Sequence, residues 1–209
     1  MDKENNSTKQ RIMDEALTLF SMKGFEPVTV AEIAEAVGIK APSLYKHYTS
    51  KHDIFDAIIA ETQARYEKQA ASMQMDGTEA DKDSSLFLNI SEETLIAMGK
   101  ELFRYFLHDE YMCKFRRLLT IEQYGDRDLA NRYVKLYADD PLSYQGMIFG
   151  MLTGAGAFIP EDPGIMALHF YAPIFLLLTI CDCHPKRETE AIRMLEGHIR
   201  QFSRVYKAK

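Results

Sequence analysis

The sequence predicts an all-α fold, with a small N-terminal helix-turn-helix part, a larger C-terminal helical part and about nine or ten helices in total. Apolar residues recur at spacings of three and four residues along most of the chain, which is the period of a helix with one buried face. No stretch of useful length alternates between apolar and polar residues as a strand does. Helix caps, glycines and prolines separate the periodic stretches.

Size and composition indicate an ordinary globular chain. Its 209 residues correspond to one or two domains at about 150 residues each, and such a chain buries enough surface to fold without disulfides or a metal. With 46% hydrophobic and 27% charged residues, it is neither collagen-like nor wholly disordered. The net charge of −6 argues against a protein that binds polyanions with its whole surface, although the local charge can differ.

The chain is expected in the cytoplasm, without a membrane anchor. Its three cysteines are an odd number, and the first ten residues lack the apolar core of a signal peptide. The most apolar stretch, residues 165–181, is shorter than the ~20 residues of a membrane span and contains His169 and Pro173. It therefore predicts a buried helix. Cys181, Cys183 and His184 offer too few ligands for zinc, so helix-end packing is favoured over a metal or redox role.

The first elements are short and sharply bounded. A helix over residues 12–23 ends at Gly24. Thr29 and Glu32 form a capping box that starts a helix over residues 30–37, and Gly38 ends it. Residues 41–48 form the next helix, with Pro42 in its first turn. A second cap at Ser50 and Asp53 opens a long helix that reaches residue 73.

Longer helices follow a predicted linker. The polar, acidic residues 76–85 predict a loop. Helices are expected from residue 91 past Phe106, over 111–123 and over 126–139. The pairs Asp140-Pro141 and Asp162-Pro163 both resemble a helix start, with Asp as N-cap and Pro as first residue. The last helix covers residues 186–206.

Residues 28–51 contain a helix-turn-helix. Two short helices are joined by four residues that include Gly38, and such a turn favours glycine because it requires a positive φ. Leu44 and Tyr48 lie on the inner face of the second helix, whereas polar side chains lie on the other face. Residues 38–52 contain three lysines and no acidic residue, a local charge of +3 in an acidic chain.

This pattern predicts contacts with double-stranded DNA. A helix of this size fits the major groove, which is ~12 Å wide. Ser43 and the ring of Pro42 would meet base edges, while Tyr45, His47, Lys51 and the helix N-termini would meet phosphates. The alternative is that Tyr45 and His47 are surface residues without a binding partner. The predicted contact set is Thr29, Lys40, Ala41, Pro42, Ser43, Tyr45, Lys46, His47 and Lys51.

The same residues resemble the TetR family of bacterial transcriptional regulators. The resemblance covers residues 7–59 and joins the capping box, the glycine turn, the segment 43–48 and the Ser50-Lys51 pair. Tyr48 stands where many relatives have phenylalanine, and Lys40 and Ala41 stand where relatives vary. The resemblance implies a DNA-binding domain over residues 1–50, an effector-binding and dimerisation domain over 51–209, and a homodimer that reads a near-palindromic operator.

The resemblance also implies that the last two helices pair with a second copy. The penultimate helix is apolar almost all round, so it requires cover on several sides. Burial within its own subunit is the alternative. The glycines at 154 and 156 resemble a nucleotide loop, but no strand precedes them. Small residues in that helix favour close helix packing or leave room for a ligand.

A mainly apolar effector is predicted in the C-terminal part. Methionine and aromatic side chains adapt to apolar ligands, and polar groups within apolar runs can orient them. Each of these residues can equally be an ordinary core or surface residue. The predicted contacts are Phe103, Phe106, His108, Met112, Phe115, Gln123, Tyr144, Met147, Met151, His169 and Phe170.

The resemblance thus implies a ligand-responsive repressor. The long helix that starts at Lys51 would carry the signal from the effector domain to the DNA-binding domain. The alternative is a DNA-anchored structural or cell-division factor on the same fold, with no small-molecule effector. The sequence contains no nucleophile motif, no metal-ligand pair at helical spacing and no cofactor loop, so an enzyme is not predicted.

Overall fold

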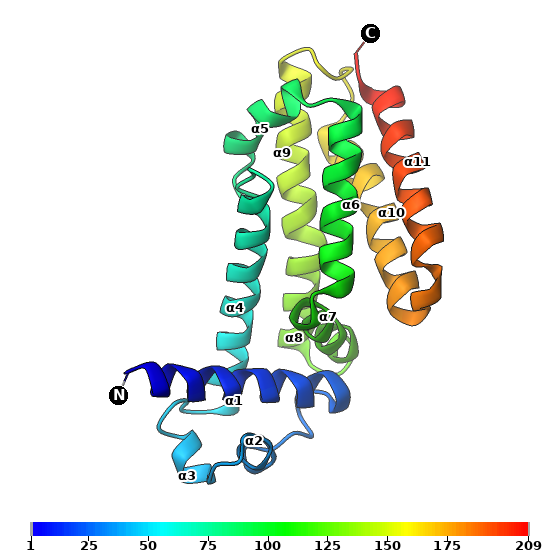
Figure 1. The fold of residues 1–209 in the computed structure, drawn as a ribbon. Coiled ribbons are helices and arrows are strands. Elements are labelled where there is room, and N and C mark those ends of the chain that lie inside the picture. Colours follow the sequence, from blue (N-terminus) through cyan, green and yellow to red (C-terminus); the bar gives the residue numbers. More distant parts are fainter. Residues whose placement is uncertain (1, 209) are drawn as a thin grey trace. The chain divides into compact units, whose positions relative to one another are not determined.

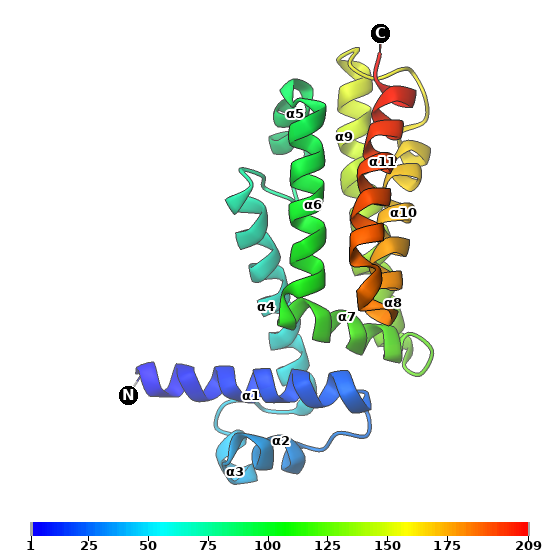
Figure 2. The ribbon, with the colours of Figure 1, turned by 45° about the vertical axis from the view of Figure 1, so that its right-hand side comes forward.

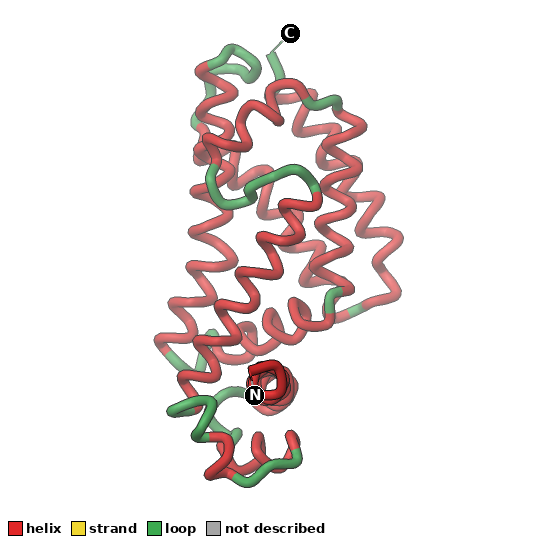
Figure 3. Tube along the Cα trace, turned by 60° about the vertical axis from the view of Figure 1, so that its left-hand side comes forward, coloured by secondary structure: helices red, strands yellow, loops and turns green. Residues whose placement is uncertain are grey.

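The computed structural model describes the backbone of residues 2–208 and the side chains of residues 8–208. This part of the chain is helical and contains no named strand, only an isolated bridge between Phe158 and Lys207 (Figure 3). The predicted all-α fold is confirmed. In order, its α-helices are α1 (Asp2–Lys23), α2 (Val30–Val37), α3 (Ala41–Leu44), α4 (Lys51–Ser72), α5 (Ala80–Asn89), α6 (Glu92–His108), α7 (Glu110–Glu122), α8 (Arg127–Val134), α9 (Asp140–Gly154), α10 (Pro163–Cys183) and α11 (Glu188–Tyr206).

The chain divides into two compact units. Unit 1 contains the residues up to Arg65 together with Asp109–Tyr133, and unit 2 contains Tyr66–His108 and Val134–Lys209. Helix α4 contributes to both units. These units differ from the expected division after residue 50 because the middle of the chain, helices α7 and α8, belongs with the N-terminal helices. The functional division into residues 1–50 and 51–209 stays a prediction.

Unit 1 is built around α1. This helix packs against α2 on one side and against α7 on another. Its core-facing residues Ile12, Ala16 and Phe20 are completely buried, as the sequence periodicity predicts. Beyond α1, the Phe25 ring packs edge-on against Phe55 of α4 at 5.3 Å between ring centres. One apolar core therefore joins the start of the chain to the first half of α4.

Unit 2 is a bundle of longer helices. Figures 1 and 2 show α6, α9, α10 and α11 side by side, and α5 packs against α9. One core cluster joins α6, α10 and α11 through residues such as Phe103, Leu177 and Leu195. A second cluster joins α5, α9, α10 and α11 around Phe149 and Met166. Helices α10 and α11 contribute to both clusters and so connect them.

The predicted loop over residues 76–85 is wrong, because most of it belongs to helix α5. The reason is a single buried carboxylate. Asp83 is 2% exposed and accepts hydrogen bonds from the backbone N–H groups of Asp76 and Gly77, both at 2.8 Å. It also accepts the hydroxyl of Tyr144 from α9 at 2.6 Å. The polar composition of residues 76–85 therefore resembles that of a loop, but the buried Asp83 side chain holds most of the segment as helix α5.

The two predicted Asp-Pro helix starts behave differently. Asp162 has an extended backbone, and its carboxylate accepts the N–H of Ile165 at 2.8 Å, so it is the predicted N-cap of α10. The prediction for Asp140 is wrong. The chain stays helical through a π-helical segment, Lys135–Asp139, and Asp140 binds the Lys135 side chain at 2.6 Å. Pro141 is accommodated by this local change of helix type, because a proline in a continuing helix removes a hydrogen bond.

Glycines on α9 permit a close approach of α10. A Cβ atom added to Gly146 would lie 3.8 Å from the Pro163 carbonyl oxygen, and one added to Gly150 would lie 3.7 Å from the Pro163 ring. Both distances are ordinary van der Waals contacts, so a small side chain fits at these two positions and neither requires glycine. Gly154 has open space around it.

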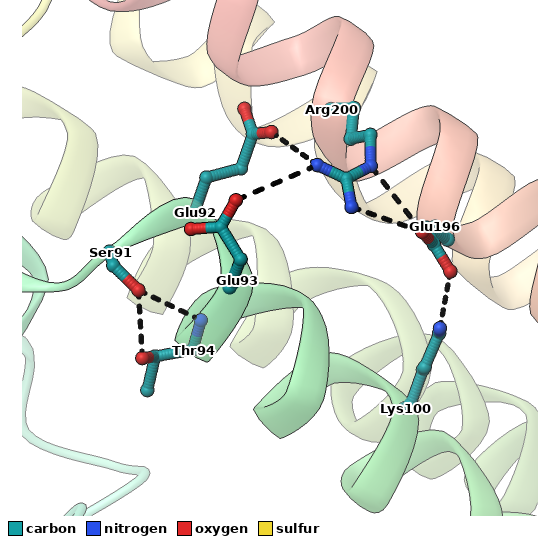
Figure 4. A network of polar contacts seen from close by, with 7 residues as sticks. All are labelled: Ser91, Glu92, Glu93, Thr94, Lys100, Glu196 and Arg200. Carbon is teal, nitrogen blue, oxygen red and sulfur yellow. Dashed lines mark hydrogen bonds and ion pairs between the residues drawn. The ribbon is translucent and has the colours of Figure 1, made fainter.

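Ion pairs join α6 to α11 on the surface of unit 2 (Figure 4). Arg200 binds Glu92 at 2.7 Å and Glu196 at 3.1 Å, and Lys100 binds the other oxygen of Glu196. Hydrogen bonds from Lys100 and Arg200 lower the pKa of Glu196. Isolated surface pairs contribute little, but a network in which one residue serves several partners costs less side-chain entropy for each bond. The network fixes the start of α6 beside α11.

Candidate nucleic-acid interface

Local hydrogen bonds set both ends of α2. The Thr29 hydroxyl accepts the Glu32 N–H at 3.2 Å, and the Glu32 carboxylate accepts the Thr29 N–H at 2.8 Å. The predicted capping box is therefore confirmed. At the other end Gly38 has a φ of +78°, as predicted, and Arg11 of α1 donates to the Val37 carbonyl at 2.6 Å. These bonds fix the angle at which the chain enters α3.

The segment after Gly38 has one buried and one accessible face. Leu44 is completely buried and Tyr48 is 3% exposed, so both are core residues as predicted. The Tyr48 hydroxyl donates to the Lys9 carbonyl of α1 at 3.3 Å, and burial raises the pKa of Tyr48 to about 12. Helix α3 proper is only four residues long, and single turns continue it to Tyr48. The second helix of the motif is thus anchored to α1.

The predicted DNA contacts lie outside this core. Pro42, Tyr45 and Lys46 are exposed, as are Thr29 and Lys40. Ala41, Ser43 and His47 are partly exposed. The structure therefore gathers hydroxyl, imidazole and ammonium groups on one accessible segment. Whether they contact DNA stays a prediction.

Lys51 has a different environment from the one expected of a phosphate contact. Its ammonium donates to the carbonyl of Phe25 at 2.8 Å and to that of Glu26 at 3.1 Å. It also lies 4.3 Å from the centre of the Phe25 ring, a cation–π contact. Lys51 therefore stabilises the loop before α2, and Lys40 and Lys46 remain as the exposed cations of this segment.

We expect the cap of α2 to make unit 1 sensitive to acid. Hydrogen bonds from the side chain of Lys23 and the backbone of Thr29 lower the pKa of Glu32 from 4.5 to about 2. A carboxylate with a lowered pKa stabilises the fold above its unfolded value, and this contribution is lost as the pH falls through the folded value. The difference in urea midpoint between wild type and Glu32→Gln should therefore shrink between pH 5 and pH 2.

Glu35→Gln, on the exposed side of the same helix, is the control for removing a charge. A difference between wild type and Glu32→Gln that stays constant down to pH 2 would contradict the assignment.

Two comparisons by sequence agree with this geometry. The family model "Bacterial regulatory proteins, tetR family" matches residues 12–58, which contain α2, α3 and their supports. The biofilm operon icaADBC HTH-type negative transcriptional regulator IcaR of Staphylococcus aureus is 28% identical over 157 residues. That match covers 74% of this chain and 66% of IcaR, so the matched segment spans just under two thirds of that relative. Residues 12–58 therefore form the N-terminal region of a TetR-family regulator.

Solved TetR-family structures share the fold along almost the whole chain. A regulator from Mesorhizobium loti has a TM-score of 0.71 at 20% identity and covers 98% of each chain. SmeT of Stenotrophomonas maltophilia, solved in complex with triclosan, has a TM-score of 0.72 at 18% identity and covers 97% of this chain and 93% of SmeT. At these identities the likeness is one of fold.

The predicted effector contacts are distributed over both units. Met112, Phe115 and Gln123 belong to unit 1, where the first two are buried and the Gln123 amide donates to the Thr120 carbonyl at 2.9 Å. The remaining eight residues belong to unit 2. The role of this set in binding an effector stays a prediction.

Within unit 2 the eight residues have different environments. Phe103 is buried, Phe106 and Phe170 pack against the core, and Met147 and Met151 are 49% and 39% exposed. His108 pairs with Glu188 at 3.0 Å. His169 lines a shallow hollow of about 360 Å³, where its ring nitrogen lies 2.5 Å from the Tyr206 hydroxyl. Tyr144 binds Asp83.

Proposed function

We propose that this chain is a transcription regulator that binds DNA as a homodimer and represses until a small molecule releases it. The supporting observation is the segment after Gly38. Leu44 is buried in the core, the Tyr48 hydroxyl bonds to α1, and the polar and cationic side chains of the segment stay accessible. A short anchored helix with such a face can enter a major groove and place its first residues near base edges.

Exposed apolar residues on α10 and α11 support the homodimer. Ile165, Leu168 and Leu176 of α10 are between 46% and 59% exposed, and Met194 and Val205 of α11 are about half exposed. Helix α10 has the length and composition of a membrane-crossing helix, and 28% of its most apolar window is buried within the chain. Ile165, Leu168 and Leu176 are spaced so that they share one face of α10, and several exposed apolar residues on one helix face indicate a binding interface. In a TetR-family chain we assign it to a second copy.

The relatives support repression rather than activation, and they support a small molecule as the effector. IcaR is named as a negative regulator, which favours repression over activation. SmeT was solved with triclosan, which favours a small, mainly apolar effector. We assign effector binding to unit 2, which contains most of the predicted contacts. A DNA-binding regulator of this kind would work in the cytoplasm.

Selection of duplexes from random DNA tests the proposal. The full chain should enrich a near-palindromic duplex, and a screen of apolar small molecules should find compounds that release it. Enrichment without any releasing compound would favour the alternative, a DNA-anchored structural factor. No enrichment would contradict the DNA-binding function.

Two substitutions should separate affinity from sequence preference. Lys46 has an exposed ammonium, so Lys46→Ala should weaken binding to all duplexes alike and reduce the slope of log affinity against log salt by about one unit. Ser43→Ala should instead change which duplex is preferred, because this residue would contact a base edge. Titrations of the selected duplex and of single-base variants at several salt concentrations measure both effects. Unchanged affinity and preference in both variants would contradict the interface.

A further inference from the structure

The backbone of Phe25 is bound by charged side chains from two other helices. Its N–H donates to the Glu122 carboxylate of α7 at 2.7 Å. Its carbonyl accepts from the Lys51 ammonium of α4 at 2.8 Å. The ring is 1% exposed and contacts Phe20, Phe55 and Lys51. Phe25 is therefore the residue at which α1, α4 and α7 meet.

Glu122 is closely packed beside Phe25, where α1, α4 and α7 meet. The side chain is 7% exposed, and a Cβ atom added to Gly24 would lie 2.6 Å from its Oε1 atom. Its Oε2 atom lies 3.7 Å from the place of a Cβ atom on Gly125. Gly24 also has a φ of +85°, which favours glycine at this position. The carboxylate thus lies beside Gly24, where a Cβ atom would displace it from the Phe25 N–H group.

The position of Phe25 determines where α2 begins. Val28, three residues later, is 1% exposed, and Thr29 is the N-cap of α2. So short a connection with two buried residues leaves little freedom between Phe25 and the helix-turn-helix. A shift of the Phe25 backbone must therefore move the start of α2, and α3 follows through the turn at Gly38.

We propose that Glu122 is a positioning residue for DNA binding, through which α7 controls the helix-turn-helix. This inference rests on the proposed function. The segment Asp109–Tyr133, which carries α7, continues into unit 2 at both of its ends. An effector that moves α7 lengthens the bond between Glu122 and the Phe25 N–H and releases the start of α2. This path is additional to α4.

Three variants test the role of Glu122. Glu122→Leu removes the acceptor but keeps a large side chain, whereas Glu122→Gln keeps an acceptor oxygen for the Phe25 N–H. Leu129→Ala, in α8 of the same unit, is the control because Leu129 is 5% exposed and its truncation lowers stability without removing a hydrogen-bond partner of Phe25. Affinity for the duplex selected above is measured at a temperature at which circular dichroism shows every variant folded.

We expect Glu122→Leu to lose about tenfold in affinity, because the unsatisfied Phe25 N–H makes the DNA-binding position of α2 about tenfold less populated relative to a released position in which water satisfies that group. Glu122→Gln should stay within about threefold of wild type because one acceptor oxygen remains. Leu129→Ala should melt at a lower temperature and bind like wild type. Amide hydrogen exchange at Phe25 should accelerate in Glu122→Leu alone. If Glu122→Leu does not fold, Glu122→Ala replaces it, with the same expected result.

Equal affinity of wild type and the leucine or alanine variant would overturn the inference, as would a glutamine variant that loses as much affinity as the leucine variant. Loss of affinity in Leu129→Ala would also overturn it, because affinity would then follow stability alone. A wild-type chain that enriches no duplex defeats the proposed function itself. The two failures are therefore distinguishable.

Discussion

Asp83→Ala should lower the free energy of unfolding of unit 2 by about 3 kcal/mol or more, since it leaves three donors without their acceptor at about 1 kcal/mol or more each. The donors are the N–H groups of Asp76 and Gly77 and the hydroxyl of Tyr144. Burial and the bond to Asp83 raise the pKa of Tyr144, so this hydroxyl stays protonated and donates. Loss of the carboxylate should therefore release the α4–α5 connection and loosen α5 from α9.

Urea unfolding followed by far-ultraviolet circular dichroism measures this effect, because the chain has no tryptophan. Asp81→Ala is the matched control, since it removes an exposed carboxylate from the same helix and should change stability by no more than about 0.5 kcal/mol. Tyr144→Phe removes one of the three donors and should cost only part of the effect. Equal midpoints for the two alanine variants would show that Asp83 does not stabilise α5.

The sequence reveals those parts of the molecule that neighbouring residues determine. The capping box of Thr29 and Glu32 and the positive φ of Gly38 depend on residues a few positions apart, so their pattern is readable. The burial of Leu44 and Tyr48 follows from helical spacing. These features fix the local structure of the segment around Gly38, which is why that structure could be predicted, whereas its contacts with DNA stay a prediction.

The sequence does not reveal features that depend on contacts between distant segments. Asp83 binds Tyr144, 61 positions later, and Glu122 binds Phe25, 97 positions earlier. In sequence, both carboxylates look like ordinary surface residues, and an acidic segment such as 76–85 resembles a loop. Lys51 likewise resembles a phosphate contact until the carbonyls of Phe25 and Glu26 are seen beside it. The glycines at 24 and 77 are a weak sequence signal of these contacts. Both have a positive φ, and they lie beside the buried carboxylates of Glu122 and Asp83, respectively.

Leu176→Arg should convert the protein into a monomer. Leu176 is 59% exposed on α10 in the single chain, so the substitution should change the stability of an isolated subunit by no more than about 0.5 kcal/mol. In the proposed dimer it places an unpaired charge in an apolar interface, which costs about 3–5 kcal/mol. Two linked DNA-binding domains bind both half-sites of a palindrome with avidity, and a monomer loses this gain. Affinity for the selected duplex should therefore fall on the order of 10²-fold or more. Analytical ultracentrifugation and duplex titration measure the two effects.

Leu88→Arg is the matched control, because Leu88 is a 43% exposed leucine on α5 of the same unit. It should leave both the oligomeric state and the affinity unchanged. A duplex with one half-site contacts a single DNA-binding domain, so it distinguishes damage to that domain from loss of the dimer. Both variants should bind this duplex as weakly as wild type does. If Leu176→Arg remains a dimer, or if wild type is a monomer at concentrations at which it binds DNA, the exposed face of α10 does not join two copies and must be covered by a different partner.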